Sequence, residues 1–182
     1  MKTSRHLLCW ISAVAFATAA LPLLAEPSIE VGQIAPRFSG HDQDGHRWAL
    51  SHYLGKKYVL LYFYPEDDTA GGTAEACGLR DNLVEFKQAG VEVVGVSSDG
   101  KKSHKEFAFK NNLAFPLLSD ASGQIAEAYG ARMGGDYKMD RRISFLIGLN
   151  GRILRITNSP DPAVHLKAMA EAIVQLSGKN SL

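Results

Sequence analysis

The chain has 182 residues, of which 46% are hydrophobic and 21% charged, and its formal net charge is +1. This composition is typical of a globular protein and excludes a disordered chain, while the near-neutral charge gives no electrostatic footprint for nucleic acid. The two cysteines, Cys9 and Cys77, are too few for a disulfide framework or a cysteine-based zinc site.

The first 25 residues have the pattern of a secretory signal peptide. Lys2 and Arg5 give a positive start, and an uncharged run and small residues follow. We predict cleavage after Ala25, with Ala20 as the alternative, and hence an exported protein of the bacterial periplasm. The length of the apolar run leaves an uncleaved membrane anchor as the other interpretation. Removal of the peptide leaves residues 26–182 as one domain.

The mature chain has a single cysteine, Cys77. Exported proteins meet an oxidising compartment, yet one cysteine cannot form an internal disulfide. Cys77 is therefore either buried and inert or available to an intermolecular partner.

Two apolar runs predict the centre of a sheet. Residues 58–64 and 91–96 are continuous, β-branched and aromatic, as in strands buried on both faces. Between them, residues 74–88 carry apolar side chains at helical spacing, and Gly90 can end that helix. A strand, helix and strand of this length predict a βαβ unit with a parallel crossover.

The next elements are shorter. Ser103 and Glu106 have the spacing of a capping box, which predicts a helix through Asn111. Residues 115–118 predict a third strand and residues 122–129 a short helix.

The C-terminal part predicts a hairpin and a final helix. Asn150-Gly151 is a strong type I′ turn signal between strands 143–149 and 152–156. Asp161 as N-cap and Pro162 at N1 open a helix that Gly178 closes. This order predicts an α/β, thioredoxin-like fold: a mixed central sheet flanked by helices on both faces, with an N-terminal strand extension.

One segment carries a family resemblance. Residues 62–77, YFYPEDDTAGGTAEAC, resemble the active-site loop of the peroxiredoxins, specifically the peroxiredoxin Q (bacterioferritin comigratory protein) group. The similarity extends over residues 29–176. Other stretches that resemble the same group are residues 31–36, 42–45, 95–99, 115–120 and 142–147.

The resemblance implies a thiol-dependent peroxidase that reduces hydrogen peroxide and organic hydroperoxides in antioxidant defence. It places Pro65 and Thr69 at the first two positions of the family motif, and Arg142 at its active-site arginine. Gly72 stands where the family has its peroxidatic cysteine, and Cys77 matches the resolving cysteine.

The chemistry explains why residue 72 matters. Peroxide reduction is an attack by a thiolate, which helix N-terminal amides and a nearby cation favour. Position 72 would have both, with Thr69 orienting the peroxide through its hydroxyl. Glycine has no side chain and cannot attack. Cys77, five residues further, is displaced about 7.5 Å along the helix and about 140° around it, so residues 71–77 would have to unwind for Cys77 to replace the missing thiol.

Each of these residues also has a structural interpretation. Thr69 suits a helix cap, Arg142 suits an ordinary ion pair with Glu75 or an aspartate, and Arg141 competes for the active-site role. Cys77 suits a small buried hydrophobe.

Other polar and aromatic groups favour structural interpretations. Residues 42–45 are a polar turn between short strands, and the histidines beside it do not make a metal site. Residues 62–64 suit strand core, and the lysines around His104 suit a solvated helix start.

Three functions remain. The first is an exported peroxidase with Cys77 as its sole thiol, reduced by a thioredoxin-like protein or a small thiol. The second is an inactive peroxiredoxin fold that binds a small anion at Thr69 and Arg142. The third is a redox sensor that dimerises through Cys77. All three predict no cofactor, no metal, no nucleic acid, and no membrane contact after signal removal; the chain is a monomer or a dimer.

Overall fold

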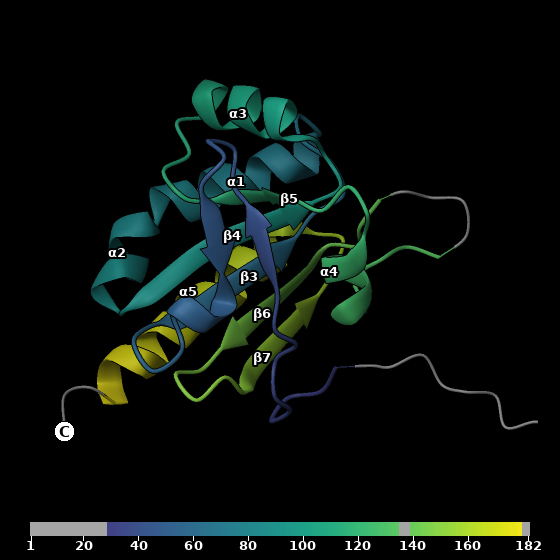
Figure 1. Cartoon of the computed structure of the whole chain (residues 1–182). Coiled ribbons are helices and arrows are strands. Elements are labelled where there is room, and N and C mark those ends of the chain that lie inside the picture. Colours follow the sequence, from purple (N-terminus) through teal and green to yellow (C-terminus); the bar gives the residue numbers. More distant parts are fainter. Residues whose placement is uncertain (1–28, 135–138, 180–182) are drawn as a thin grey trace, which may run out of the picture.

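The structure is a computed structural model that describes residues 29–134 and 139–179 (Figure 1). The predicted signal peptide, residues 1–25, lies outside these ranges. Within them, no helix is both long and apolar enough to cross a membrane.

A five-stranded mixed sheet forms the centre of the molecule. Its strand order is β5-β4-β3-β6-β7, with β3 parallel to β4, β4 parallel to β5, and antiparallel pairing in β3/β6 and β6/β7. The predicted βαβ unit and mixed sheet are therefore confirmed. The strands are β3 (Tyr58–Phe63), β4 (Val91–Ser97), β5 (Leu117–Ser119), β6 (Ile143–Ile147) and β7 (Ile153–Asn158).

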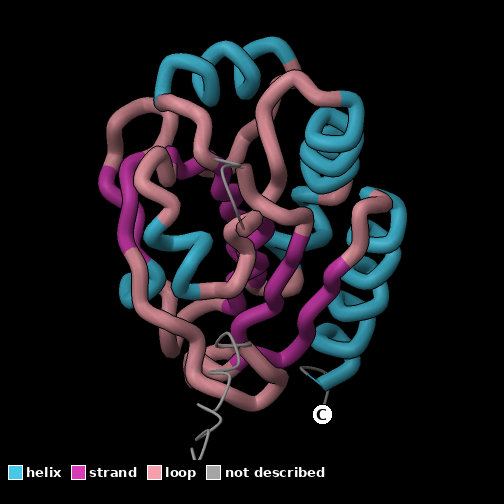
Figure 2. The backbone as a smooth tube through the Cα atoms, turned by 90° about the vertical axis from the view of Figure 1, so that its right-hand side faces the viewer, coloured by secondary structure: helices cyan, strands magenta, loops and turns pink. Residues whose placement is uncertain are grey.

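Helices cover both faces of this sheet, so the strands run through the middle of the molecule in Figure 2. One apolar cluster packs α1, α2, α3 and α5 on one face, and a second packs α4 and the N-terminal hairpin on the other. The helices are α1 (Ala70–Asp81), α2 (Leu83–Gln88), α3 (Lys101–Lys110), α4 (Gln124–Ala128), α5 (Pro162–Lys179) and the short 3₁₀ helix η1 (Leu50–His52).

The N-terminal strand extension is a separate hairpin of β1 (Ser39–His41) and β2 (Arg47–Ala49). Its turn is polar, as predicted. Asp42 Oδ1 accepts hydrogen bonds from the main-chain N–H groups of Asp44 and His46. The side chain of Gln43 reaches the main chain of β5 and the residues before it: Nε2 donates to the Phe115 carbonyl and Oε1 accepts from the Leu117 N–H.

Two helix predictions need correction. The helix predicted over residues 74–88 begins earlier, at Ala70, and is divided at Asn82, whose side-chain amide donates back to the Gly78 carbonyl. The capping box was wrong: α3 begins after Gly100, and the Ser103 hydroxyl donates to Asp67 Oδ2. The Ser103 hydroxyl, which the local pattern assigned to a helix cap, instead forms a tertiary hydrogen bond.

The hairpin turn also differs from the prediction. A type I′ turn needs positive φ at both central residues, but Gly151 alone has it here; among the described residues that are not glycine, only Asp68 and Asn112 do. Instead, the Gly151 N–H donates to the Gly148 carbonyl and the Gly148 N–H donates to the Arg152 carbonyl, so residues 149–151 form a three-residue loop. The Asp161 cap is confirmed, because its Oδ1 accepts from the Ala163 N–H.

Candidate active site

The site is built around the first turn of α1, which Thr69 caps. The Thr69 hydroxyl accepts from the Gly72 N–H at 3.1 Å and donates to the Glu66 carbonyl at 2.9 Å. A hydroxyl has one proton, so its donor is already used. The geometry thus gives Thr69 the capping role that the sequence offered as its structural interpretation.

The loop before α1 is held by a buried carboxylate, Asp67. Pro65 lies half-buried just after β3. Asp67 Oδ1 accepts from the Tyr64 hydroxyl at 2.7 Å, and Oδ2 accepts from Ser103 at 2.7 Å and from His104 Nδ1 at 2.9 Å. We call Tyr64, Asp67, Ser103 and His104 the Asp67 cluster.

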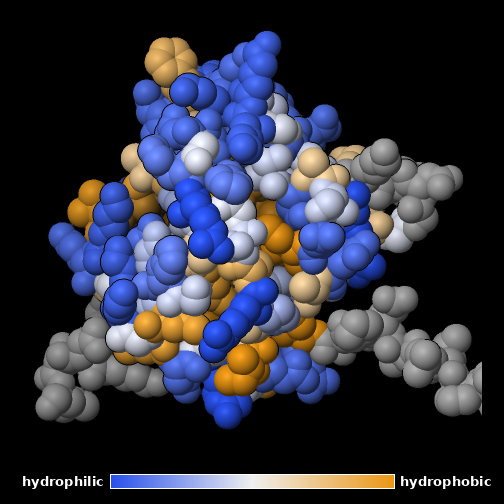
Figure 3. Space-filling view, viewed as in Figure 1, coloured by the Kyte–Doolittle hydropathy of each residue, from blue (hydrophilic) through white to orange (hydrophobic). Residues whose placement is uncertain are grey.

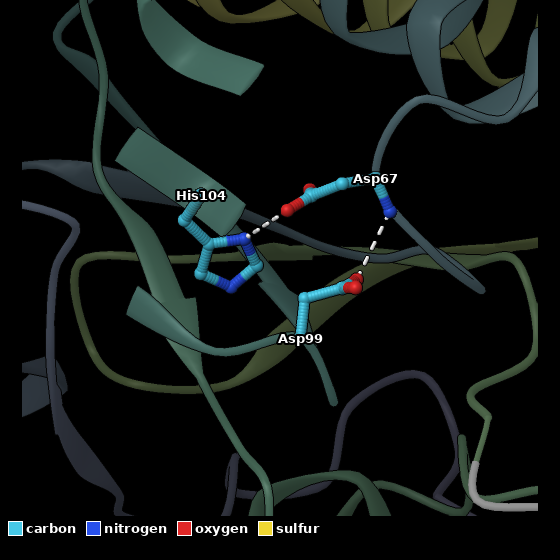
Figure 4. A group of neighbouring side chains, drawn as sticks. All are labelled: Asp67, Asp99 and His104. Atoms are coloured by element: carbon cyan, nitrogen blue, oxygen red, sulfur yellow. Dashed lines mark hydrogen bonds and ion pairs between the residues drawn. The ribbon is translucent and has the colours of Figure 1, made fainter. Parts of the chain in front are cut away.

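The bonds of the Asp67 cluster decide its electrostatics. Burial alone would raise the pKa of Asp67, but hydrogen bonds from His104, Ser103 and Tyr64 outweigh it and lower that pKa. The Asp67 main-chain N–H in turn donates to Asp99 (Figure 4). The carboxylate therefore ties β3, the loop and α3 together.

The same cluster has one feature of a metal site. One ligand atom each from Asp67, Asp99 and His104 lie within 4.8 Å of one another. However, both Asp67 oxygens accept protein hydrogen bonds, and Asp99 Oδ2 accepts from the Ser97 hydroxyl at 2.7 Å and from the main chain. The arrangement is that of a structural clamp, in which three of the four carboxylate oxygens already accept protein hydrogen bonds.

His104 corrects a sequence prediction. The lysines around it are exposed, as expected, and the surface over α3 is mostly hydrophilic (Figure 3). His104 itself is fully buried, however, so it is not part of a solvated helix start. Its spacing to Phe107 and Ala108 places the three on one buried helix face, a signal that the sequence did contain.

Gly72 is packed against the preceding loop. A Cβ at this position would lie 2.7 Å from the Glu66 carbonyl oxygen and 2.8 Å from Thr69 Oγ1, closer than real Cβ atoms approach. At Gly71, a Cβ would lie 2.7 Å from Nη2 of Arg142. The loop before α1 thus packs directly against the main chain of Gly72 and leaves no room for a side chain there. The Arg142 guanidinium lies beside the same helical turn.

Arg142, not Arg141, lies against α1. Its Nη1 forms a buried ion pair with Glu75 Oε2, whereas Arg141 is exposed. Burial raises the pKa of Glu75 to about 7, although Arg142 and then Ser144 act in the opposite direction. The ion pair that the sequence offered as an alternative is present, in a position that also faces Gly71.

Two further residues complete this second cluster, and sequence reasoning missed both. The Ser144 hydroxyl lies 2.7 Å from His165 Nδ1, and Glu75 Oε1 lies 3.5 Å from the same nitrogen. We call Glu75, Arg142, Ser144 and His165 the Glu75 cluster. Its members come from α1, β6 and α5, and no local pattern joins them.

Cys77 lies on the side of α1 that faces the end of α3. It is half-buried, and its Sγ is 3.7 Å from Asn111 Oδ1. Arg80 donates to the Asn111 carbonyl at 2.7 Å; its pKa is raised mainly by Asp81, with a smaller contribution from Cys77. The structure thus brings Thr69, Gly72 and Arg142 together but gives Cys77 other neighbours.

These features define a thioredoxin-like fold of the peroxiredoxin type, in which a capped helix after β3 meets an arginine at the start of β6. The model of the AhpC/TSA family matches residues 31–156. Peroxiredoxin Bcp of Escherichia coli strain K12 is 46% identical over 130 residues, covering 69% of this chain and 83% of that protein. The chloroplastic peroxiredoxin Q of Oryza sativa subsp. japonica is 35% identical over 182 residues, with 89% and 83% covered.

A solved structure agrees with these relatives. Peroxidoxin BcpB from Mycobacterium tuberculosis matches with a TM-score of 0.75 and 31% identity, over 82% of this chain and 97% of that one. The chain belongs to the AhpC/TSA family and, within it, to the peroxiredoxin Q/Bcp group.

Proposed function

We propose that this chain is an exported, thiol-dependent peroxidase of the bacterial periplasm in which Cys77 is the reactive thiol. Membership of the peroxiredoxin Q/Bcp group supports peroxide chemistry. The observation that carries the proposal is the environment of Cys77: a half-buried residue with Arg80 and Asn111 as polar neighbours. Such surroundings differ from those of an inert cysteine in an apolar core.

The proposed reaction has two stages. The Cys77 thiolate attacks one oxygen of a hydroperoxide, the O–O bond breaks, and the departing oxygen takes a proton to leave as alcohol or water. Sulfur is oxidised to a sulfenic acid. A thiol of a thioredoxin-like protein or a small reductant then forms a mixed disulfide and releases water. A second thiol frees Cys77 and leaves the reductant as a disulfide.

Gly72 sets the expected rate. The family resemblance assigns the peroxidatic position to residue 72, and we propose that this chain has lost that cysteine. The folded site gives Thr69 and Arg142 no contact with the Cys77 sulfur. Turnover through Cys77 is therefore expected to be slow, unless residues 71–77 unwind and bring the sulfur to Arg142; Gly71 and Gly72 favour such opening by about 1 kcal/mol each relative to alanine.

The test is hydrogen peroxide consumption by the full chain with excess dithiothreitol. Cys77→Ser is expected to reduce the rate to that of dithiothreitol alone, whereas the matched variant Cys9→Ser keeps the wild-type rate. Equal rates for the wild type and Cys77→Ser would contradict the proposal.

A non-catalytic binding module is the second candidate, favoured by the closed contact between Gly72 and Glu66. It predicts that neither the wild type nor Cys77→Ser consumes peroxide. It also predicts that the protein binds a small anion and that Arg142→Gln abolishes this binding. A redox sensor is the third candidate. It predicts a dimer after peroxide treatment that dithiothreitol dissociates and that Cys77→Ser cannot form.

Export has its own test. After expression in a Gram-negative host, the protein in the periplasmic fraction is expected to begin at Glu26, or at Leu21 if cleavage follows Ala20. A chain that retains Met1 and fractionates with membranes would support an uncleaved anchor instead.

A further inference from the structure

The Glu75 cluster contains a row of polar groups that runs through the interior from α1 to the loop before α5. Glu75, Ser144 and His165 are each 1% exposed. His165 Nδ1 lies 2.7 Å from Ser144 Oγ, and its Nε2 lies 2.9 Å from the Ser159 carbonyl oxygen. Burial raises the pKa of Glu75, whereas Arg142 and, with a smaller effect, Ser144 lower it, so Ser144 favours the charged carboxylate.

The donors and acceptors in this row fix where protons must be. A carbonyl oxygen only accepts, so His165 Nε2 carries a hydrogen in every state of the ring. With a Glu75 carboxylate and a neutral imidazole, Glu75 Oε1 and His165 Nδ1 both need the single proton of Ser144. Glu75 Oε1 indeed has no hydrogen-bond partner within the described residues. A buried acceptor without a donor is costly.

One additional proton removes this conflict, and it can be placed in two ways. On Glu75, it lets Oε1–H donate to Ser144, whose hydroxyl then donates to His165 Nδ1. On His165, it lets Nδ1–H donate to Ser144, whose hydroxyl then donates to Glu75. The two arrangements use the same heavy atoms and differ by the direction of two hydrogen bonds.

We propose that Glu75, Ser144 and His165 share one proton, and that Ser144 and His165 are positioning residues that control Arg142 through Glu75. When the proton lies on His165, the Glu75 carboxylate holds the guanidinium; when it lies on Glu75, that hold weakens. The inference rests on the proposed function only in treating Arg142 as part of the site.

Other charged groups around the row come from neighbouring elements. Burial lowers the His165 pKa; Arg142, just before β6, acts in the same direction, and Asp161, before α5, acts in the opposite one. Tyr62 from β3 faces Glu75, and its pKa is raised well above its usual range by burial, so it stays neutral. Glu75 and His165 are therefore the two sites between which the proton moves, and both pKa shifts favour Glu75.

Nuclear magnetic resonance of the full chain tests the proposal directly, through the Glu75 carboxyl carbon and the His165 ring nitrogens between pH 5 and 9. In the wild type, both residues and the Arg142 Nε–H signal are expected to change with one common midpoint. Ser144→Ala is expected to separate the titrations and to raise the Glu75 midpoint by about one pH unit, because a donor to the carboxylate is lost.

Two further variants make the result specific. Ser144→Thr keeps a hydroxyl and is expected to restore the common midpoint. Ser119→Ala removes a hydroxyl that donates to the Asp99 carbonyl, on another strand, and is expected to change neither titration. Independent titrations in the wild type that Ser144→Ala leaves unmoved would overturn the proposal. Because this readout needs no turnover, a shared proton in a protein that consumes no peroxide would reject the proposed function and leave this inference standing.

Discussion

The Asp67 cluster and the Glu75 cluster flank the start of α1, and both centre on a buried carboxylate next to a histidine. At Asp67, both oxygens accept hydrogen bonds from neighbouring side chains. At Glu75, Oε2 pairs with Arg142, while Oε1 lies 3.5 Å from His165 Nδ1 and has no hydrogen-bond partner among the residues that the structure describes. The two carboxyl groups accordingly have pKa values shifted in opposite directions, lowered for Asp67 and raised for Glu75.

The difference shows that burial raises the pKa of a carboxyl group unless the hydrogen bonds that it accepts outweigh this effect. A carboxylate with several donors stays charged and fixes its surroundings. One with an unsatisfied oxygen takes up a proton close to neutral pH and can release it again. The first cluster therefore fastens the loop, and the second is able to respond to protons.

Removing the charge of Asp67 is expected to have the largest effect. Asp67→Asn leaves Ser103, His104 or Tyr64 without its acceptor and should lower the free energy of unfolding by about 3 kcal/mol. Urea denaturation at pH 7 measures this loss. The matched variant is Asp68→Asn, since Asp68 is exposed, pairs only with Lys110 among the interactions described, and has a positive φ that asparagine tolerates. A loss in Asp67→Asn no greater than in Asp68→Asn would show that the cluster is no clamp.

The Glu75 cluster predicts a pH dependence of the opposite sign to that of Asp67. Because the pKa of Glu75 rises from 4.5 to about 7 on folding, the folded chain binds the proton more tightly than the unfolded chain. This contribution to stability is complete below pH 4.5 and is lost as the pH rises to 7. Asp67, with a lowered pKa, contributes stability that is lost only as the pH falls below its usual range near 3.8.

Glu75→Gln tests that slope. Glutamine mimics the protonated carboxyl, so the variant should be within about 1 kcal/mol of the wild type at pH 5. Between pH 5 and 7.5, the wild type should lose about 2 kcal/mol more than the variant, measured from urea midpoints at each pH. Part of the slope should remain in the variant, because the pKa of Asp140 is also raised, to about 6. If the stabilities of the wild type and Glu75→Gln changed with pH in parallel, Glu75 would not be the group that binds this proton.

The smallest effects are expected at the two glycines between the clusters. Gly72→Ala directs a Cβ at the Glu66 main chain and should destabilise by about 1 kcal/mol, after the helical preference of alanine is counted. Gly71→Ala directs it at the end of the flexible Arg142 side chain and should cost less than about 0.5 kcal/mol. Thermal unfolding of the pair measures the contrast, and a larger loss at Gly71 would mean that the Glu75 cluster is the more rigid side.

The sequence predicted the sheet well because its strands are buried on both faces. The apolar run 58–64 contains β3, and the run 91–96 lies within β4. Local signals failed where a distant partner intervened. Ser103 was a plausible cap in sequence, but Asp67, 36 residues earlier, takes its hydroxyl.

The site was predicted only as far as the family motif reaches. The resemblance predicts that Thr69, Gly72 and Arg142 form one site; in the fold, Thr69 bonds to Gly72 and Arg142 lies beside Gly71. The contact between Gly72 and Glu66 depends on the path of the loop, and the role of His165 depends on three separate elements. Neither leaves a pattern along the chain.

The Gln43 side chain has a consequence for behaviour in concentrated solution. Strand β5 is at one edge of the sheet, where free main-chain groups invite pairing with another chain. The side-chain amide of Gln43 hydrogen-bonds to the Phe115 carbonyl and to the Leu117 N–H. It therefore makes the two bonds that a peptide group of a neighbouring strand would make. At the other edge, residues 32 and 33 bond to both main-chain groups of Ile153. At both edges, the first residue of the strand is thereby closed to pairing with another chain, at β5 by a single side chain.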